Sequence, residues 1–205
     1  MKSLLNIGSG KISIDDFPDF DCVVHLDQSY AYGLCSTIAE IEERMASKSE
    51  TRRRVLFCGE DIFTFMDTFK FKFSHINADR IFEHMFYDCG EVGRLLDACN
   101  QITEDDGTMT IIVPNAADIA RLLLEFEDDE KFFTQPSRKI DAMKILVNTE
   151  LQNTKSDPHG SSWSPKLAAS YIQSEGGTWR IDNIVEQYFH KGRSIYMKIE
   201  CSKPR

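Results

Sequence analysis

The sequence predicts an α/β fold, a mostly parallel Rossmann-like sheet of seven strands with helices on both faces, and three observations support that prediction. Apolar runs of strand length alternate with helix-length segments from residue 3 to residue 126. The runs are apolar at nearly every position, as expected of parallel strands that are buried on both faces. Towards the other end, the runs at 178–189 and 194–201 are joined by the turn sequence HKGR, which predicts an antiparallel hairpin.

The spacing of apolar residues predicts each strand and helix. The five parallel strands are the runs SLLNI, CVVHL, RVLFC, FSHIN and TMTIIVP. Apolar residues three and four positions apart predict helices near 37–48, 90–103, 116–126 and 137–151, and a short helix after the third strand. The Phe-rich run at 63–73 has helix spacing and then strand spacing, which indicates core packing.

The segment SWSPKLAASYIQSEGG carries the clearest helix signals in the chain. Ser164 is of the type that caps a helix, and Pro165 fits the first helical turn because its missing N–H would be unpaired there. Gly176 and Gly177 then end the helix. Between these signals we expect one apolar stripe, made of Leu167, Ala168, Tyr171 and Ile172.

Length and composition narrow the class of protein. The 205 residues are 41% hydrophobic and 28% charged, which suits one globular domain spanning residues 1–205. A net charge of −9 weighs against unaided binding to the phosphate backbone of nucleic acids. No run approaches the roughly 18 apolar residues that a membrane helix needs, and the N-terminus lacks a signal-peptide pattern. Six cysteines without a CxxC pair or metal-ligand spacing indicate no metal site and a reducing, cytoplasmic environment.

Glycines and acids follow the first three predicted strands. The first strand runs directly into Gly8 and Gly10, and glycine lets a backbone turn sharply and approach a ligand closely. Asp27 follows the second strand, where a carboxylate binds the two hydroxyls of a ribose in nucleotide-binding βαβ units. Glu60 and Asp61 follow the third strand, within reach of an adenine amino group. Since ligands of open α/β sheets bind at the carboxyl ends of strands, this pattern predicts a nucleoside site.

A ligand with a pyrophosphate is disfavoured. The dinucleotide fingerprint GxGxxG would need glycine in place of Ser13. Only eleven residues, 11–21, separate the glycines from the second strand, whereas parallel crossovers usually need a dozen or more. The chain also has no GxxxxGK[ST] sequence and so no P-loop. A nucleoside without a pyrophosphate fits better, and an NAD or nucleotide-sugar site is the weaker alternative.

Five segments, spread over nearly the whole chain, occur in a characteristic order. They are LNIGSG, HLDQS, FSHINADRIFEHM, LLDACNQITEDDGTMTIIVPN and DPHGSSWSPKLAASYIQSEGGTWRIDNI. In this order they resemble the class I S-adenosylmethionine-dependent methyltransferases, and more narrowly the small predicted methyltransferase branch of that family. The resemblance implies a sheet whose last strand is antiparallel, S-adenosylmethionine as cofactor and S-adenosylhomocysteine as product.

The residues that the resemblance assigns to the cofactor lie at the ends of the first four strands. Those expected on the methionine and ribose side are Asn6, Gly8, Ser9 and Gly10. Those expected at the ribose hydroxyls and the adenine are Asp27, Gln28, Asp61 and Ile62, and those facing the methyl group, after the fourth strand, are Asn77 and Ala78. The family often has an acid at the opening of the fourth-strand motif, where this chain has Ser74, and we expect this change to weaken cofactor binding.

The chemistry that the resemblance implies is methyl transfer by in-line displacement. A side chain that removes a proton is needed only for some acceptors, and the candidates are His84, His159 and Glu83. A small hydroxylated or amino metabolite is the favoured acceptor, ahead of a protein and then RNA, and residues 126–163 are expected to cap the acceptor side. The alternative, which Ser74 favours, is a catalytically silent methyltransferase fold that serves as a binding or assembly module.

Overall fold

The computed structural model describes residues 2–8, 17–28, 35–47, 53–86, 88–125, 161–175, 177–190 and 193–204. The strands in these ranges are β1 (Ser3–Ile7), β2 (Cys22–Leu26), β3 (Arg54–Cys58), β4 (Phe73–Asp79), β5 (Thr103–Pro114), β6 (Arg180–His190) and β7 (Arg193–Ser202). The helices are α1 (Ile38–Ala46), α2 (Ile62–Thr68), α3 (Glu91–Gln101), α4 (Ala116–Glu125) and α7 (Pro165–Glu175), with a short 3-10 helix, η1 (Phe82–His84), after β4. The helix expected at 137–151 lies outside the described residues.

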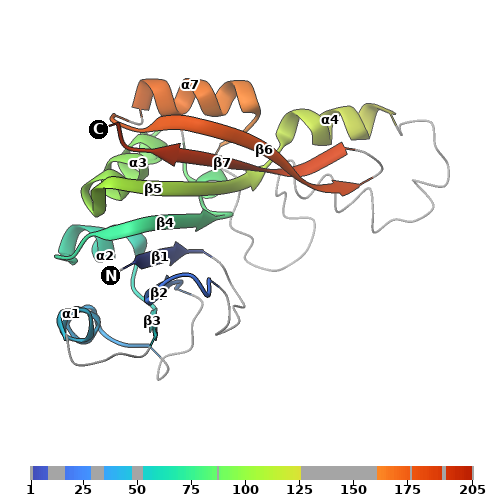
Figure 1. The fold of residues 1–205 in the computed structure, drawn as a ribbon. Helices are drawn as coiled ribbons and strands as arrows, with labels where there is room; N and C mark the ends of the chain where they lie inside the picture. Colours follow the sequence, from blue (N-terminus) through green and yellow to red (C-terminus); the bar gives the residue numbers. More distant parts are fainter. Residues whose placement is uncertain are drawn as a thin grey trace.

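All seven strands form one sheet in the order β3-β2-β1-β4-β5-β7-β6 (Figure 1). Strands β1 to β5 are parallel, whereas β7 is inserted antiparallel between β5 and β6. The strand order reverses at β1, because β2 and β3 lie on one side of it and β4 and β5 on the other. Such a reversal is the point at which open α/β sheets bind ligands. The predicted seven-stranded, mostly parallel sheet with a C-terminal hairpin is confirmed.

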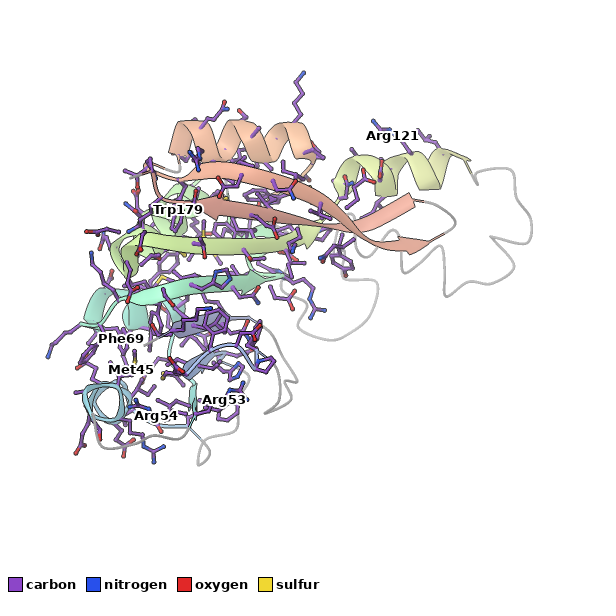
Figure 2. All side chains as sticks on the ribbon, viewed as in Figure 1. Met45, Arg53, Arg54, Phe69, Arg121 and Trp179 are labelled. Atoms are coloured by element: carbon purple, nitrogen blue, oxygen red, sulfur yellow. The ribbon has the colours of Figure 1, made fainter. Side chains whose placement is uncertain are left out.

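One hydrophobic core joins a face of the sheet to helices α1, α2, α3 and α7. Phe65, Phe69 and Phe73 form a continuous stack in it, with ring centroids 4.7 and 5.2 Å apart. Met45 of α1 and Trp179, which precedes β6, are buried in the same core (Figure 2). The core packing predicted for the Phe-rich run is therefore confirmed.

The opposite face of the sheet carries a buried row of polar side chains. His25, Asn6 and Asn77 are register partners on β2, β1 and β4. The Asn77 Nδ2 donates to the Asn6 Oδ1 at 2.7 Å, and the Asn6 Nδ2 lies 3.0 Å from the His25 Nδ1. Phe57 of β3 stacks on the His25 ring with centroids 5.2 Å apart. Buried polar groups need partners, so these hydrogen bonds favour one register of β2, β1 and β4. The row lies close to the carboxyl ends of these strands.

Helix α7 begins and ends as predicted. The Ser164 Oγ accepts from the Leu167 N–H at 3.2 Å, and Gly177, just after the helix, has a φ of +59°. Ala168 and Ile172 are buried as expected. Leu167 is 40% exposed, so the expected apolar stripe is wrong at that residue, where the helix already faces solvent.

The boundary between α3 and β5 differs from the prediction. The helix expected at 90–103 ends at Gln101, because β5 begins already at Thr103. Phe73 pairs with Thr103, and after a shift in register His75 pairs with Thr108. Strand β5 is therefore longer than the apolar run TMTIIVP from which it was predicted, because an irregular pairing extends it toward its amino end.

Candidate functional site

A cleft lies at the carboxyl ends of β1, β2 and β3, beside the turn that follows β4. Its volume of about 390 Å³ is within the range of roughly 300 to 1,000 Å³ that small-molecule sites have. The cleft adjoins the point where the strand order reverses. It is lined by Ile7, Gly8, Leu26, Asp27, Gln28, Glu60, Asp61, Ile62, Phe63, Ile81, His84, Met85 and Glu91.

Gly8 makes the sharp turn that ends β1. Its φ of +75° is a left-handed backbone conformation that residues other than glycine rarely adopt. A Cβ at this position would lie 2.0 Å from the Ile81 Cγ1 and 3.0 Å from the carbonyl oxygen of Asp79. The Gly8 N–H donates to the carbonyl of Leu26 at 3.1 Å, which ties the turn to β2. Glycine is therefore required here for the turn and for the close approach of the segment after β4.

Two acids and an amide meet where β2 and β3 end. Asp27 directly follows β2 and lines the cleft beside Gln28. Asp61 caps α2, because its Oδ1 accepts from the N–H groups of Phe63 and Thr64, both at 3.0 Å. The Asp61 Oδ2 accepts from the Gln28 Nε2 at 3.2 Å. One carboxylate thus begins the helix and links the ends of two neighbouring strands.

The cleft is acidic. Among the described residues that line it are Asp27, Glu60, Asp61 and Glu91, and there is no lysine or arginine. The imidazole of His84 also lines it. Because carboxylates around a partly enclosed site raise the local concentration of cations, the arrangement suits a ligand with a positively charged centre.

The 3-10 helix η1 forms the wall of the cleft next to β4. His84 lines the cleft, whereas Glu83 is 2% exposed and does not line it. Burial raises the pKa of Glu83 to about 8. Ser161 fixes η1 through two backbone carbonyls. Its N–H donates to the Glu83 carbonyl at 3.1 Å, and its Oγ donates to the Phe82 carbonyl at 2.8 Å. Trp163 packs edge-on against Phe82, with ring centroids 5.7 Å apart.

The two residues expected after the fourth strand lie inside it instead. Asn77 and Ala78 belong to β4, because pairing with β5 continues as far as Asp79 and Ile112. Both are buried, as is Asn6, and none of the three lines the cleft. Asn77 and Asn6 bond to each other in the polar row described above. The position assigned to Asn77 and Ala78 relative to the strand was therefore wrong.

Ser74 lies away from the cleft, at the amino end of β4. Its Oγ donates to the Ser3 carbonyl at 2.8 Å and accepts from the Ser3 N–H at 2.9 Å. The acid at the carboxyl end of β4 is Asp79, which sequence reasoning missed. The signal was present, because Asp79 ends an apolar strand much as Asp27 follows β2. Serine in place of an acid at position 74 therefore gives no reason to expect weaker binding in the cleft.

Three predicted site residues, Ser9, Gly10 and His159, lie outside the described residues, as does most of the 126–163 region. In the part of the chain that the structure describes, no helix is long and apolar enough to cross a membrane. The same part contains no group of three His, Cys, Asp or Glu side chains that could hold a metal ion.

Comparisons with known proteins agree on the fold. No family model matches the sequence, and no curated protein matches it significantly. The 1,6-didemethyltoxoflavin-N1-methyltransferase of Burkholderia thailandensis aligns over 99% of this chain and 71% of its own, with 12% identity and a TM-score of 0.55. The N-methyltransferase NodS of Bradyrhizobium japonicum aligns over 100% and 79%, with 11% identity and a TM-score of 0.57. A methyltransferase of Methanosarcina mazei aligns over 98% and 92%, with 15% identity and a TM-score of 0.58. The chain therefore has the fold of the class I S-adenosylmethionine-dependent methyltransferases.

Proposed function

We propose that this protein is a methyltransferase that binds S-adenosylmethionine in the cleft. One observation carries the proposal: a left-handed glycine turn after β1 and a carboxylate directly after β2 line the same cleft, where the strand order reverses. The Burkholderia and Bradyrhizobium enzymes are described as complexes with S-adenosylhomocysteine, which supports the same class of ligand for this fold.

The residues of the cleft fit this cofactor chemically. Asp27 would accept hydrogen bonds from the ribose hydroxyls, with Gln28 beside it. Asp61 and Ile62 would adjoin the adenine. The acidic lining suits the positive charge of a sulfonium. Ser9 and Gly10 stay proposed contacts of the methionine, and the buried Asn6, Asn77 and Ala78 would act from beneath the cleft rather than as contacts.

When bound, the cofactor supplies an electrophilic methyl group on a sulfonium sulfur. The task of the chain is to hold the acceptor in line with that group and to exclude water, because positioning supplies much of the acceleration of such a displacement. A proton acceptor is needed only if the nucleophile carries a proton that it must lose. His84, which lines the cleft, and Glu83 and His159 are the proposed candidates for that step.

The rival interpretation, a catalytically silent binding or assembly module, loses one of its supports. That interpretation drew in part on the acid missing at Ser74, and Ser74 bonds to Ser3 at the amino end of β4. The lack of a recognisable acceptor motif still supports it. With the argument from Ser74 gone, we favour an active enzyme. The cysteines, which form no CxxC pair, support a location in the cytoplasm. A small hydroxylated or amino metabolite is the proposed acceptor, ahead of a protein and then RNA, on the grounds of the net charge of −9 and the compact size of the chain.

Calorimetric titration with S-adenosylmethionine and with S-adenosylhomocysteine tests this proposal. We expect both to bind, and Asp27→Ala to weaken both about tenfold or more, since hydrogen bonds to a charged group contribute ~1.5 to 3 kcal/mol. Asp105→Ala is the matched control, because this side chain is 96% exposed near the amino end of β5. Absence of binding to the unaltered protein would contradict the proposed function, and an unchanged affinity in Asp27→Ala would remove Asp27 from the site.

A further inference from the structure

Arg94 and Phe63 form a stacked pair beside the cleft. The central carbon of the Arg94 guanidinium lies 3.9 Å from the centroid of the Phe63 ring. This separation is well within the ~6 Å over which an aromatic face attracts a cation. Phe63 belongs to the first turn of α2, and Arg94 lies near the start of α3. Because Phe63 lines the cleft and Arg94 does not, Arg94 covers one face of the ring from outside the cleft.

Both helices hold Arg94 in this position. Its Nη2 lies 3.6 Å from the Oδ2 of Asp67, which is one turn after Phe63 on α2. Since both charged side chains are more than half exposed, this ion pair contributes little to stability by itself. It orients the guanidinium over the ring instead. Val92 and Leu95, on either side of Arg94 along α3, are fully buried in the core, so the helix that carries Arg94 is firmly packed.

The wall that contains Phe63 suits a planar base. The start of α2 supplies three consecutive residues of the cleft, Asp61, Ile62 and Phe63. Among the described residues that line the cleft, Phe63 carries the only phenyl ring, and aromatic rings stack with any nucleobase because every base has a π-face. Asp61 and Gln28, which bond to each other at 3.2 Å, line the same cleft and supply polar groups for the edge of a base.

Resting on the proposed function, we infer that the adenine of S-adenosylmethionine packs against Phe63 and that Arg94 is a positioning residue, which holds this ring without touching the ligand. The Phe63 side chain is only half-buried, and fixing a partly free side chain on binding costs free energy. A guanidinium is planar and stacks on aromatic rings, whereas an ammonium is a compact point charge. Arg94 therefore orders the ring before the ligand arrives.

Long-range electrostatics alone predicts the opposite effect of Arg94. A cation close to a cleft lined by four acidic residues weakens the attraction of that cleft for a positively charged ligand. If Arg94 acted only through its charge, its removal would strengthen the binding of a sulfonium. If it acts through the Phe63 ring, its removal weakens binding. The sign of the change separates the two roles, and S-adenosylhomocysteine, which carries no sulfonium, isolates the effect of the ring.

A double-mutant cycle on S-adenosylhomocysteine binding tests the inference. We expect Arg94→Met, which keeps a long side chain, to weaken binding about two- to fivefold by calorimetry. Phe63→Leu should weaken it about fivefold or more. Arg94→Met should have no further effect in Phe63→Leu, because it acts only through the ring. Lys72→Met is the matched control, since this cation pairs with Asp105 at 3.2 Å near the amino end of β4 and should not change the affinity.

The adenine protons of the bound ligand report the stacking directly. Protons above the face of a phenyl ring resonate upfield in the NMR spectrum. The adenine protons of bound S-adenosylhomocysteine should therefore lie further upfield in the unaltered protein than in Phe63→Leu, and Arg94→Met should reduce this shift. A residue that only stabilises the fold would weaken binding without changing the position of these signals.

The outcomes separate this inference from the proposed function. An equal effect of Arg94→Met with and without the Phe63 ring would make Arg94 a structural residue, and an unchanged affinity would leave it no role. Absence of the upfield shift would place the adenine elsewhere. Each of these results overturns the inference and leaves the cofactor site standing, whereas the proposed function fails as well if the unaltered protein does not bind S-adenosylhomocysteine. Should Phe63→Leu not fold, the adenine signals of the unaltered protein and of Arg94→Met provide the test, and equal positions in both overturn the inference.

Discussion

The Gln28 Nε2 donates to the Asp61 Oδ2 at 3.2 Å, which joins the end of β2 to the start of α2 beside the cleft. The other oxygen of the same carboxylate, Oδ1, accepts from the N–H groups of Phe63 and Thr64. Since both Gln28 and Asp61 line the cleft, the cap of the helix and the proposed adenine side share one carboxyl group. Loss of the Oδ1 should therefore lower the stability of the fold, whereas loss of the Oδ2 should affect the adenine side of the cleft.

Replacement of Asp61 distinguishes the two roles. Asp61→Ala removes the cap of α2 and should lower the free energy of unfolding by about 1 kcal/mol, the usual effect of losing such a cap. Asp61→Asn keeps an oxygen that can accept from Phe63 and Thr64, so most of that stability should remain. Urea denaturation of both variants measures the difference, and equal losses would contradict the capping role.

Two glycines of similar conformation separate backbone strain from steric clash. Gly8 and Gly90 have φ values of +75° and +74°, but a Cβ on Gly90 would meet nothing within 4 Å, whereas one on Gly8 would meet Ile81 at 2.0 Å. Gly90→Ala should therefore cost only the left-handed strain, about 1 to 2 kcal/mol. Gly8→Ala should cost about 1 to 3 kcal/mol more, as overpacking does. Equal melting temperatures for the two variants would show that Ile81 moves aside freely.

The stability of the protein should depend on pH through Glu83. Its pKa is raised from 4.5 to about 8 in the folded state, so the folded state holds this proton more tightly than the unfolded state. The stability that results is present below pH 4.5 and is lost as the pH rises through about 8. His75, whose pKa burial lowers from 6.5 to about 4, has the opposite effect, but only below about pH 6.5.

The comparison with Glu83→Gln isolates Glu83 in the interval above pH 6.5, because the buried thiols of Cys99 and Cys201, whose pKa burial raises to about 12, lower the stability of both proteins alike near its upper end. Between about pH 6.5 and 8.5 the free energy of unfolding should fall by about 2 kcal/mol in the unaltered protein and by much less in Glu83→Gln. Urea denaturation at the two pH values measures this fall. A flat profile in the unaltered protein would mean that Glu83 is already ionised in the folded state, in disagreement with its burial.

The strands could be predicted from the sequence because buried parallel strands are apolar at nearly every position. The boundaries that failed lie where polar residues continue a strand. β5 begins at Thr103, among acidic residues that are typical of a loop, because Phe73 pairs with it across the sheet. β4 continues past Asn77 to Asp79 because Ile112 completes its pairing. Pairing partners far away in the chain set these limits, and spacing within one segment does not reveal them.

The candidate site was predictable to the extent that it follows the ends of strands. That reasoning found seven residues that line one cleft, namely Gly8, Asp27, Gln28, Glu60, Asp61, Ile62 and His84. It missed Ile81 because the clash that requires glycine at position 8 comes from a residue 73 positions later in the chain. It assigned Asn6 and Asn77 to the ligand, whereas they bond to each other inside the sheet.

Strand β7 lies between β5 and β6, although it comes after both of them in the chain. Among the described strands, β5 therefore keeps an unpaired edge during synthesis, and β6 has no neighbour in the sheet, until residues 193–202 emerge from the ribosome. An unpaired edge is a template for strands of other molecules. A product whose translation stops before Arg193 should consequently aggregate through the edge of β5, and nascent chains of this protein should depend on chaperones until β7 is made.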